Sequence, residues 1–463
     1  MNNKLSKYVG DRAFYKKVLA VSVPIMVQNA ITNFVSLLDN IMVGRLGTEE
    51  MSGVAIVNQL FFVCYLALFG AIAGAGIFTA QYFGKADDEG VRYTFRFKLV
   101  ICTIIIAATV AILYFAGDGL IDMYLRGNDD GGDIVATHHF GYEYMVIMFA
   151  GLPAMMLSQI YSGTLRECGR TFVPMVAGII AVVINLIFNY LLIYGMFGFP
   201  EMGVEGAAFA TVISRWIEAL IVIVWTHHNS HINTYIVGMY RNFRIPAELT
   251  FSIIRRGTPL LINETLWSLG MAMLMQCYSV RGLSVVAGMN ICNTVVNIFY
   301  VVFFAMGDAV AILVGQLLGA GKMKEAKDTA VKLISLGVFS AVVLAFVVFF
   351  TSGLYPLFYN IDEHTSELAV GFIRLSALFM PQIAFLHASY FTIRSGGKTF
   401  ITFLFDSVFL IVVSLPIAYV LSRFTDMDIF MLYFLVQLAD GIKSAIAYIL
   451  IKKEIWINNI VND

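Results

Sequence analysis

Charge is the scarcest property of this 463-residue sequence. Only 13% of the residues are Asp, Glu, Lys or Arg, whereas a soluble domain contains about 25%. The 30 basic residues almost balance the 31 acidic ones, so there is no net charge to attract a polyanion. This composition excludes a soluble enzyme, a disordered chain and a nucleic-acid-binding protein.

Cysteine and nucleotide-binding motifs are also poorly represented. The five cysteines lie in or beside apolar segments at no metal or redox spacing, which indicates small core residues rather than a disulfide framework. The sequence has no GxxxxGK[ST] motif, so it gives no sign of a P-loop that would bind ATP. A membrane enzyme would need a clustered nucleophile and base, of which His227, His228 and His231 are the only trace. We therefore expect neither enzymatic activity nor a cofactor.

Long hydrophobic stretches are what the sequence has in abundance. Hydrophobic types form 59% of the chain, and twelve stretches are long enough for a membrane-spanning helix, which needs about 20 residues. The stretches lie near 16–44, 51–83, 92–116, 135–165, 172–196, 204–227, 252–280, 284–318, 328–353, 365–393, 399–422 and 428–452. The sequence thus predicts an all-α polytopic membrane protein with twelve transmembrane helices.

The charges between these stretches alternate in sign. Basic residues collect in the N-terminal tail, in every second gap and at the C-terminal end, whereas the intervening gaps are acidic. Lys322 and Lys324 illustrate the basic gaps, and Asp118 and Asp122 the acidic ones. Because basic loops stay in the cytoplasm, both termini are expected there and the protein is expected in the inner (plasma) membrane.

The chain consists of two related halves. Three pairs share an offset of 235 residues: Pro24 with Pro259, Asn58 with Asn293, and Gln81 with Gln316. Later the offset becomes 228, where LRECGRTF (165–172) matches IRSGGKTF (393–400) and Arg215 matches Lys443. We predict two pseudo-symmetric six-helix lobes, 1–231 and 251–463, joined by a cytoplasmic linker at 232–250. Parallel repeats of this kind occur in secondary transporters, whose substrate site lies between the repeats.

Polar residues form matching stripes in the two halves. The first stretch contributes Gln28, Asn29, Asn33, Ser36 and Asp39, and the seventh contributes Asn263, Glu264, Trp267 and Met271, with Asn58 and Asn293 in the stretches that follow them. A polar stripe is costly in lipid, so it has to line protein or water. We predict a central cleft in which Trp267 and Met271 give an adaptable apolar surface. The alternative is that these amides only form hydrogen bonds between helices.

Ionisable residues inside the stretches suggest ion coupling. Asp39 and Glu264 have no evident local partner, and a desolvated carboxylate either carries a proton or ligates Na⁺. Arg215 with Glu218, and Asp440 with Lys443, are three residues apart and are interpreted as structural pairs. For Asp406 and Asp308 the sequence favours a functional role and a structural role equally. Pro24 and Pro259 lie inside stretches that they should bend.

At these residues the sequence resembles the multidrug and toxic compound extrusion (MATE) family. The motifs that carry the resemblance are LLDNIMVGRLG (37–47), AQYFGKAD (80–87), LRECGRT (165–171), GVEGAAFATVIS (203–214), GTPLLINETLWSLG (257–270), VGQLLGAGK (314–322) and IRSGGKT (393–399). The resemblance implies cation-coupled efflux by alternating access, with H⁺ or Na⁺ as the coupling ion. It also implies that Asp39 and Glu264 take part in coupling. Asn185 and Thr211 match positions of an N-lobe cation site, and Asn189 stands where the family often has an acid.

The resulting prediction is an antiporter that exports organic, cationic and amphipathic drugs or metabolites. The partners would be the small-molecule solute and the lipid bilayer, without nucleic acid, and the chain would act as a monomer. The only metal ion expected is Na⁺ at Asp39. A lipid-linked precursor flippase of the same superfamily is the alternative, and it would favour a basic cleft.

Overall fold

The computed structural model describes residues 7–125, 133–359 and 361–462, apart from the side chains of 35–37, 40 and 41. All regular elements in this part of the chain are helical, which confirms the all-α prediction. The chain divides into two compact units, each of which is described by itself. Unit 1 contains 1–26, 80–86 and 253–463, and unit 2 contains 27–79 and 87–252.

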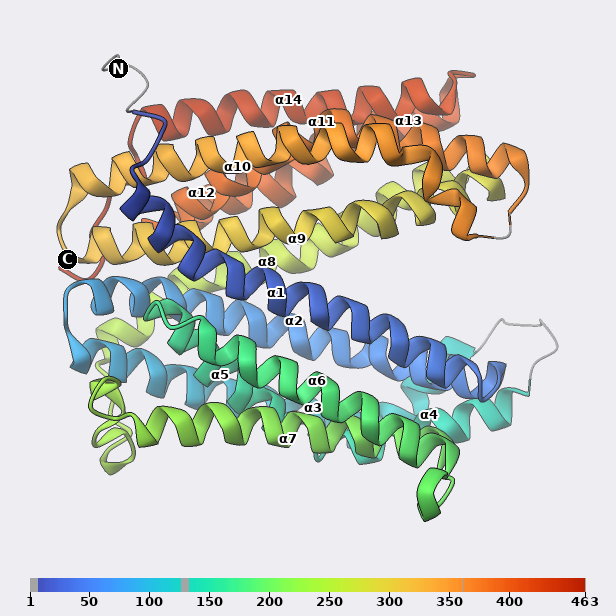
Figure 1. Ribbon diagram of the computed structural model, residues 1–463, viewed down its shortest axis with the longest axis horizontal. Coiled ribbons are helices and arrows are strands. Elements are labelled where there is room, and N and C mark those ends of the chain that lie inside the picture. Colours follow the sequence, from blue (N-terminus) through green and yellow to red (C-terminus); the bar gives the residue numbers. More distant parts are fainter. Residues whose placement is uncertain (1–6, 126–132, 360, 463) are drawn as a thin grey trace. The chain divides into compact units, whose positions relative to one another are not determined.

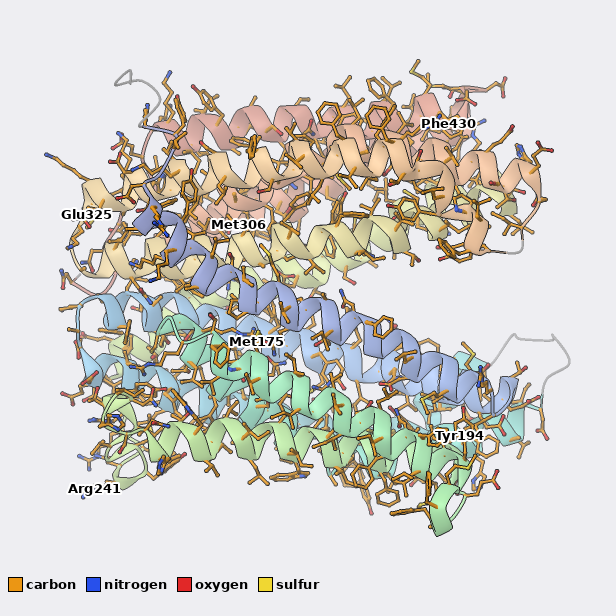
Figure 2. The ribbon with its side chains drawn as sticks, viewed as in Figure 1. Met175, Tyr194, Arg241, Met306, Glu325 and Phe430 are labelled. Carbon is orange, nitrogen blue, oxygen red and sulfur yellow. The ribbon has the colours of Figure 1, made fainter. Side chains whose placement is uncertain are left out.

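Unit 2 is a bundle of long helices (Figure 1). It holds the larger parts of α1 (Arg12–Gly44) and α2 (Thr48–Gly84), together with α3 (Asp88–Leu125), α4 (Ile134–Met148), α5 (Leu152–Glu167), α6 (Phe172–Tyr194) and α7 (Gly203–His228). α7 packs along α6 and also contacts α4 and α5. Within this unit, Arg241 and Tyr194 lie at opposite ends of the bundle (Figure 2). The basic segment after α7 is therefore at the end opposite to the α6–α7 turn.

Local sequence explains where two of these helices begin or end. Asp133 caps α4, since its side chain accepts hydrogen bonds from the backbone N–H groups of Val135 and Ala136. α6 ends at Gly195, whose φ of 63° lies in the left-handed region that glycine adopts without strain.

Unit 1 contains the helices of the second half of the chain. They are most of α8 (Ala247–Ser279), then α9 (Leu283–Gly319), α10 (Met323–Thr351), α11 (Glu363–Ser395), α12 (Thr399–Phe403), α13 (Leu415–Phe424) and α14 (Ile429–Lys452). α11 packs along α9, α10 and α14. Its buried residues Phe372 and Met380 join Leu432 of α14 in the apolar core of this unit. The core thus lies along α11.

The helices agree with the predicted stretches, and one of them is more polar than the rest. Nine helices of the described residues are long and apolar enough to cross a membrane, and α4 with α5, bent by 51°, form a tenth if they are one span. α8 has 33 residues but is not in this group. It carries one of the predicted polar stripes, which lowers its hydropathy. A helix that needs protein or water on one face is expected to look this way.

Two π-helical turns interrupt the eleventh stretch. α12 continues into π-helical segments at Leu404–Val408 and Leu410–Ser414 before α13 begins. Pro416 explains the second of these, because proline has no N–H to donate to the carbonyl of Val412 and its ring crowds that turn. The wider turns change the register of the side chains that precede Pro416, including Asp406.

Two repeat-related glycines bring backbones into close contact within unit 1. A Cβ added to Gly84 would lie 1.9 Å from the carbonyl oxygen of Gln316, and one added to Gly319 would lie 1.9 Å from that of Gln81. Gln81 with Gln316, and Gly84 with Gly319, share the 235-residue offset of the repeat. The ends of α2 and α9 therefore meet in a reciprocal contact that only glycine permits.

Gly319→Ala is expected to destabilise the protein strongly. Its methyl group meets backbone rather than a movable side chain, so the cost should reach or exceed the roughly 1–3 kcal/mol of ordinary overpacking. The measurement is the midpoint of thermal unfolding of the purified protein in detergent. Gly337→Ala is the matched control, because no atom lies within 4 Å of its added Cβ, and its midpoint should not fall.

The C-terminal residues bind to the same contact. Gln81 Nε2 donates to the carbonyls of Ser395 and Asn458 at 2.9 and 3.2 Å, and Gln81 Oε1 accepts from the N–H of Ile460 at 2.9 Å. Trp456 is 1% exposed. The chain after α14 is thus an integral part of unit 1.

Candidate ion and solute site

Asp39 lies beside two amides and a hydroxyl within unit 2. Asn189 Nδ2 donates to Asp39 Oδ1 at 2.6 Å and to Asn185 Oδ1 at 3.3 Å. Asn185 Nδ2 in turn donates to Thr211 Oγ1 at 3.4 Å. Asn185 and Asn189 share one face of α6 because they are four residues apart. The structure thus brings together Asp39 and the three residues that the resemblance placed near it.

The Asn185 amide lies between Thr211 and Asp39, and its orientation decides which of the two its nitrogen bonds. In the opposite orientation, Asn185 Nδ2 donates to Asp39 Oδ1 at 2.9 Å and to Asp39 Oδ2 at 3.1 Å. In the described structure Asn189 Oδ1 is buried and accepts no hydrogen bond. Carboxylate and amide oxygens are the ligands that hard cations prefer.

The neighbouring base is neutralised within its own helix. Arg215 Nη1 forms an ion pair with Glu218 Oε2 at 2.9 Å, which confirms the predicted pair. Arg215 acts on Asp39 through its field. Within the described part of the chain, no Lys, Arg or His comes within ion-pair distance of Asp39, as the eight pairs found all involve other residues. Asp39 is therefore bonded to an amide and to no cationic side chain.

The corresponding region of unit 1 is organised differently. Asn263 is 1% exposed and donates to Asp406 Oδ2 at 3.1 Å. Lys443 Nζ donates to Asp406 Oδ1 at 2.6 Å. Ser407 donates to Asn263 Oδ1 at 2.7 Å. An ion pair between α14 and the π-helical segment is thus held by an amide of α8.

The predicted pairing of Lys443 was wrong. Sequence spacing suggested Asp440, one turn earlier on α14, but the ion pair is with Asp406. Asp440 Oδ1 instead accepts from Ser414 Oγ at 3.2 Å. Tertiary packing of α14 against the π-helical turns decides this choice.

Glu264 is half-buried on α8, next to Asn263. The charged groups whose fields act on it are Arg394 and Asp406. It is thus near, but not a member of, the Asp406–Lys443 ion pair.

The other predicted site residues are distributed along the stripes. Gln28 accepts from Arg166 Nη2 at 2.6 Å, and Asn58 accepts from Tyr144 at 3.4 Å. Of the remaining positions, Asn29 is half-buried, and the exposed ones are Asn33, Trp267, Met271 and Asn293. The side chain of Ser36 is outside the described part. Pro24 and Pro259 lie inside the continuous helices α1 and α8. Their predicted part in bending remains a prediction.

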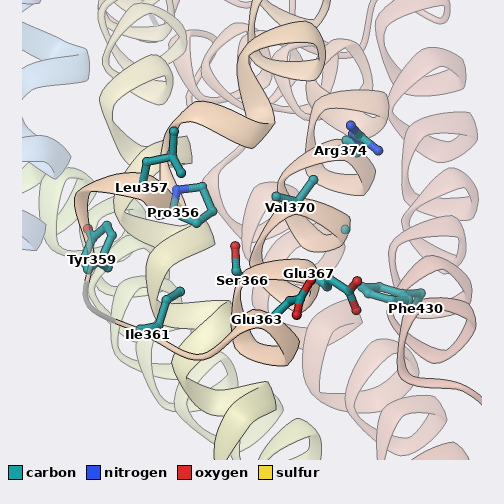
Figure 3. Close-up of a pocket in the computed structure, with 11 residues that line it drawn as sticks. Pro356, Leu357, Tyr359, Ile361, Glu363, Ser366, Glu367, Val370, Arg374 and Phe430 are labelled. Carbon is teal, nitrogen blue, oxygen red and sulfur yellow. The ribbon is translucent and has the colours of Figure 1, made fainter.

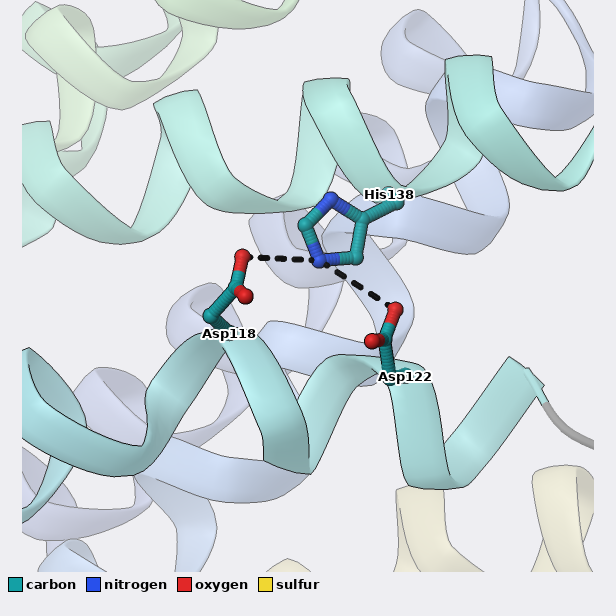
Figure 4. Close-up of side chains that lie close together, drawn as sticks. All are labelled: Asp118, Asp122 and His138. Carbon is teal, nitrogen blue, oxygen red and sulfur yellow. Dashed lines mark ion pairs between the residues drawn. The ribbon is translucent and has the colours of Figure 1, made fainter.

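A charged group that sequence reasoning did not single out joins α3 to α4. His138 Nε2 lies 3.1 Å from Asp118 and 3.5 Å from Asp122 (Figure 4). Asp118 is 71% exposed. The four-residue spacing of the aspartates was the available signal, but their histidine partner lies on another helix, α4. We interpret this cluster as an ion pair between the end of α3 and the start of α4.

A pocket of about 750 Å³ opens beside the start of α11. Glu363, Glu367 and Arg374 give it charge, and Phe430 forms one wall (Figure 3). None of the predicted site residues lines it.

Comparison with known proteins supplies the family. The MatE family model matches residues 24–191 and 259–420. The chain belongs to the MatE family. The two matched segments of this MatE chain begin at Pro24 and Pro259, which the internal repeat equates.

Relatives of this MatE chain resemble it over most of their length. The probable multidrug resistance protein NorM of Thermotoga maritima is 24% identical over 422 residues, covering 89% of this chain and 87% of the relative. The multidrug resistance protein PmpM of Pseudomonas aeruginosa is 25% identical over 420 residues, covering 90% and 86%.

Solved structures support the fold of the MatE chain. A crystal structure described as MATE in the bent conformation matches with a TM-score of 0.85 at 18% identity, over 98% of both chains. The Vibrio cholerae MATE transporter VcmN, as a mutant, matches with a TM-score of 0.84 at 15% identity, over 96% of this chain and 98% of that one. The chain is thus a multi-pass membrane protein of the MATE type.

Proposed function

We propose that this chain is a cation-coupled antiporter of the plasma membrane that exports organic, cationic and amphipathic solutes. Its relatives include proteins named for multidrug resistance. The coupling ion is H⁺ or Na⁺, both termini are cytoplasmic, and the chain acts as a monomer.

The observation that carries the proposal is the environment of Asp39. A carboxylate within a membrane helix costs about 3 kcal/mol on insertion scales, so an intramembrane acid is costly to retain. The acid here accepts a hydrogen bond from Asn189, lies against the Asn185 amide, and forms no ion pair with a basic side chain of the described residues. That arrangement suits an exchangeable cation better than a permanent ion pair.

In the proposed mechanism, the coupling ion and the cationic solute compete for the Asp39 carboxylate. On the outer side the coupling ion binds Asp39, which neutralises it and weakens its attraction for a cationic solute. On the cytoplasmic side the ion leaves, and the carboxylate is again available to the solute. Glu264 plays the equivalent part in the second half, where Trp267 and Met271 supply apolar contact for the rest of the solute.

A transport assay with two separate gradients tests this function. The purified protein is reconstituted into liposomes, and the liposomes are loaded with a fluorescent organic cation. Either a pH gradient or a Na⁺ gradient is then imposed across the membrane. We expect movement of the dye against its own gradient under one of the two, and the effective gradient identifies the ion. Protein-free liposomes under the same gradients are the control.

A lack of organic-cation transport under both gradients would favour a lipid-linked precursor as the substrate. If neither gradient moves organic cations while the protein transfers a lipid-linked anionic precursor between leaflets, antiport is wrong and the flippase alternative is supported.

A further inference from the structure

The two halves place a basic residue at equivalent positions but give it different partners. Arg215 and Lys443 are related by the 228-residue offset of the repeat. Arg215 is neutralised by Glu218 on its own helix. Lys443 reaches across to Asp406 on another segment. The carboxylate near Arg215 is consequently left to amides, whereas the carboxylate near Lys443 already holds a cation.

The surroundings of Lys443 are those of a cation site. Its side chain is 12% exposed and that of Asp406 is 19% exposed. Asn263 bonds the second oxygen of Asp406, the Asp440 carboxylate acts on the ammonium group through its field, and the Phe405 ring lies 5.9 Å from Nζ. One carboxylate and an aromatic ring thus lie beside this positive charge, and a second carboxylate acts on it through its field.

Stability alone does not explain this ion pair. Removing two charges from water costs several kcal/mol per ion, and a buried pair often stabilises no better than an apolar one of similar volume. The Asp406 turn is also π-helical, and π-helical turns occur frequently at functional sites. Both facts favour a role in transport.

We propose that Lys443 is a tethered cation that closes the Asp406 site to monovalent cations from solution. The inference rests on the proposed antiport function. Lys443 thereby sets how many ions accompany each solute, because a free Asp406 would add one cation site to those at Asp39 and Glu264. Lys443 is a specificity-determining residue for the ion, acting through the carboxylate that it occupies.

Binding of ²²Na⁺ to the purified protein tests the proposal in a background from which the N-lobe acid has been removed. Relative to Asp39→Asn alone, the added change Lys443→Gln should create one additional saturable Na⁺ site per chain. Lys443→Arg is the matched control and should add none, since it keeps the charge. A third change, Asp406→Asn, should abolish the gain.

Two outcomes would overturn the proposal. The first is that a Lys443→Gln protein that remains monodisperse gains no additional Na⁺ site. The second is that Asp406→Asn, made alone in the otherwise unchanged protein, loses one bound Na⁺ ion, which would show that Asp406 already serves as a free site. We expect this variant to keep the full number of bound Na⁺ ions, and its result does not depend on whether the lysine variants fold.

The test is separate from that of the proposed function. Failure of gradient-driven transport in the unchanged protein would refute antiport. If the unchanged protein transports normally but Lys443→Gln gains no extra Na⁺ site, only the proposed role of Lys443 is refuted.

Discussion

Asp39→Asn is expected to reduce gradient-driven export of an organic cation to the level of protein-free liposomes. Asparagine preserves the size of the side chain and can still bond to Asn189, but it has no charge to exchange between ion and solute. The measurement is the initial rate of dye movement in proteoliposomes under whichever gradient drives the unchanged protein. A loss of at least about tenfold, or 1.4 kcal/mol, is expected.

Two comparisons separate coupling from folding in this experiment. Asp118→Asn removes an exposed carboxylate from the same unit and should transport normally. Solute binding in the absence of a gradient should persist in Asp39→Asn through the apolar contacts, though more weakly. Coupled transport at the unchanged rate in Asp39→Asn would disprove the assignment of this residue.

Lys98→Met is expected to destabilise the protein by about 3–5 kcal/mol, because it leaves the carboxylate of a buried ion pair without its lysine. Lys98 is fully buried on α3, forms an ion pair with Glu167 of α5 and donates to Thr164 Oγ1 at 3.1 Å. Glu167 is 15% exposed, so little water can replace the lost charge. Unfolding in mixed micelles, followed by the intrinsic fluorescence, gives the change in the free energy of unfolding.

A double-mutant comparison isolates the electrostatic part of this effect. Lys98→Met combined with Glu167→Gln should recover much of the loss, because the second change removes the buried charge. Lys327→Met is the matched control, since Lys327 and Glu454 are 46% and 42% exposed, and a pair in water should cost less than about 1 kcal/mol. Equal losses in Lys98→Met and Lys327→Met would contradict the explanation.

Lys98 also shows what the pattern of charges along the sequence can and cannot predict. In the sequence it belongs with the basic residues of a gap that is predicted to be cytoplasmic, beside Arg92 and Arg96. The structure buries it completely against α5. Its positive charge supports the predicted membrane orientation, which remains a prediction, whereas its burial depends on Glu167, which lies 69 residues later.

The sequence by itself determined the all-helical fold, the internal repeat and the membership of a transporter family. These follow from properties that are local or periodic: runs of apolar residues, fixed offsets between repeated motifs, and short matching segments. The pair Arg215–Glu218 was predictable for the same reason, because three-residue spacing places both side chains on one face of a helix.

Only the tertiary structure decided which distant charges meet. Asp406 and Lys443 are 37 residues apart, and their contact depends on π-helical turns and on the packing of α14. The same holds for the polar cluster of Asp39, Asn185, Asn189 and Thr211, whose members come from three helices. Spacing along the chain determines which residues are neighbours one turn away on the same helix. The partner on another helix is selected by burial, side-chain register and helix packing.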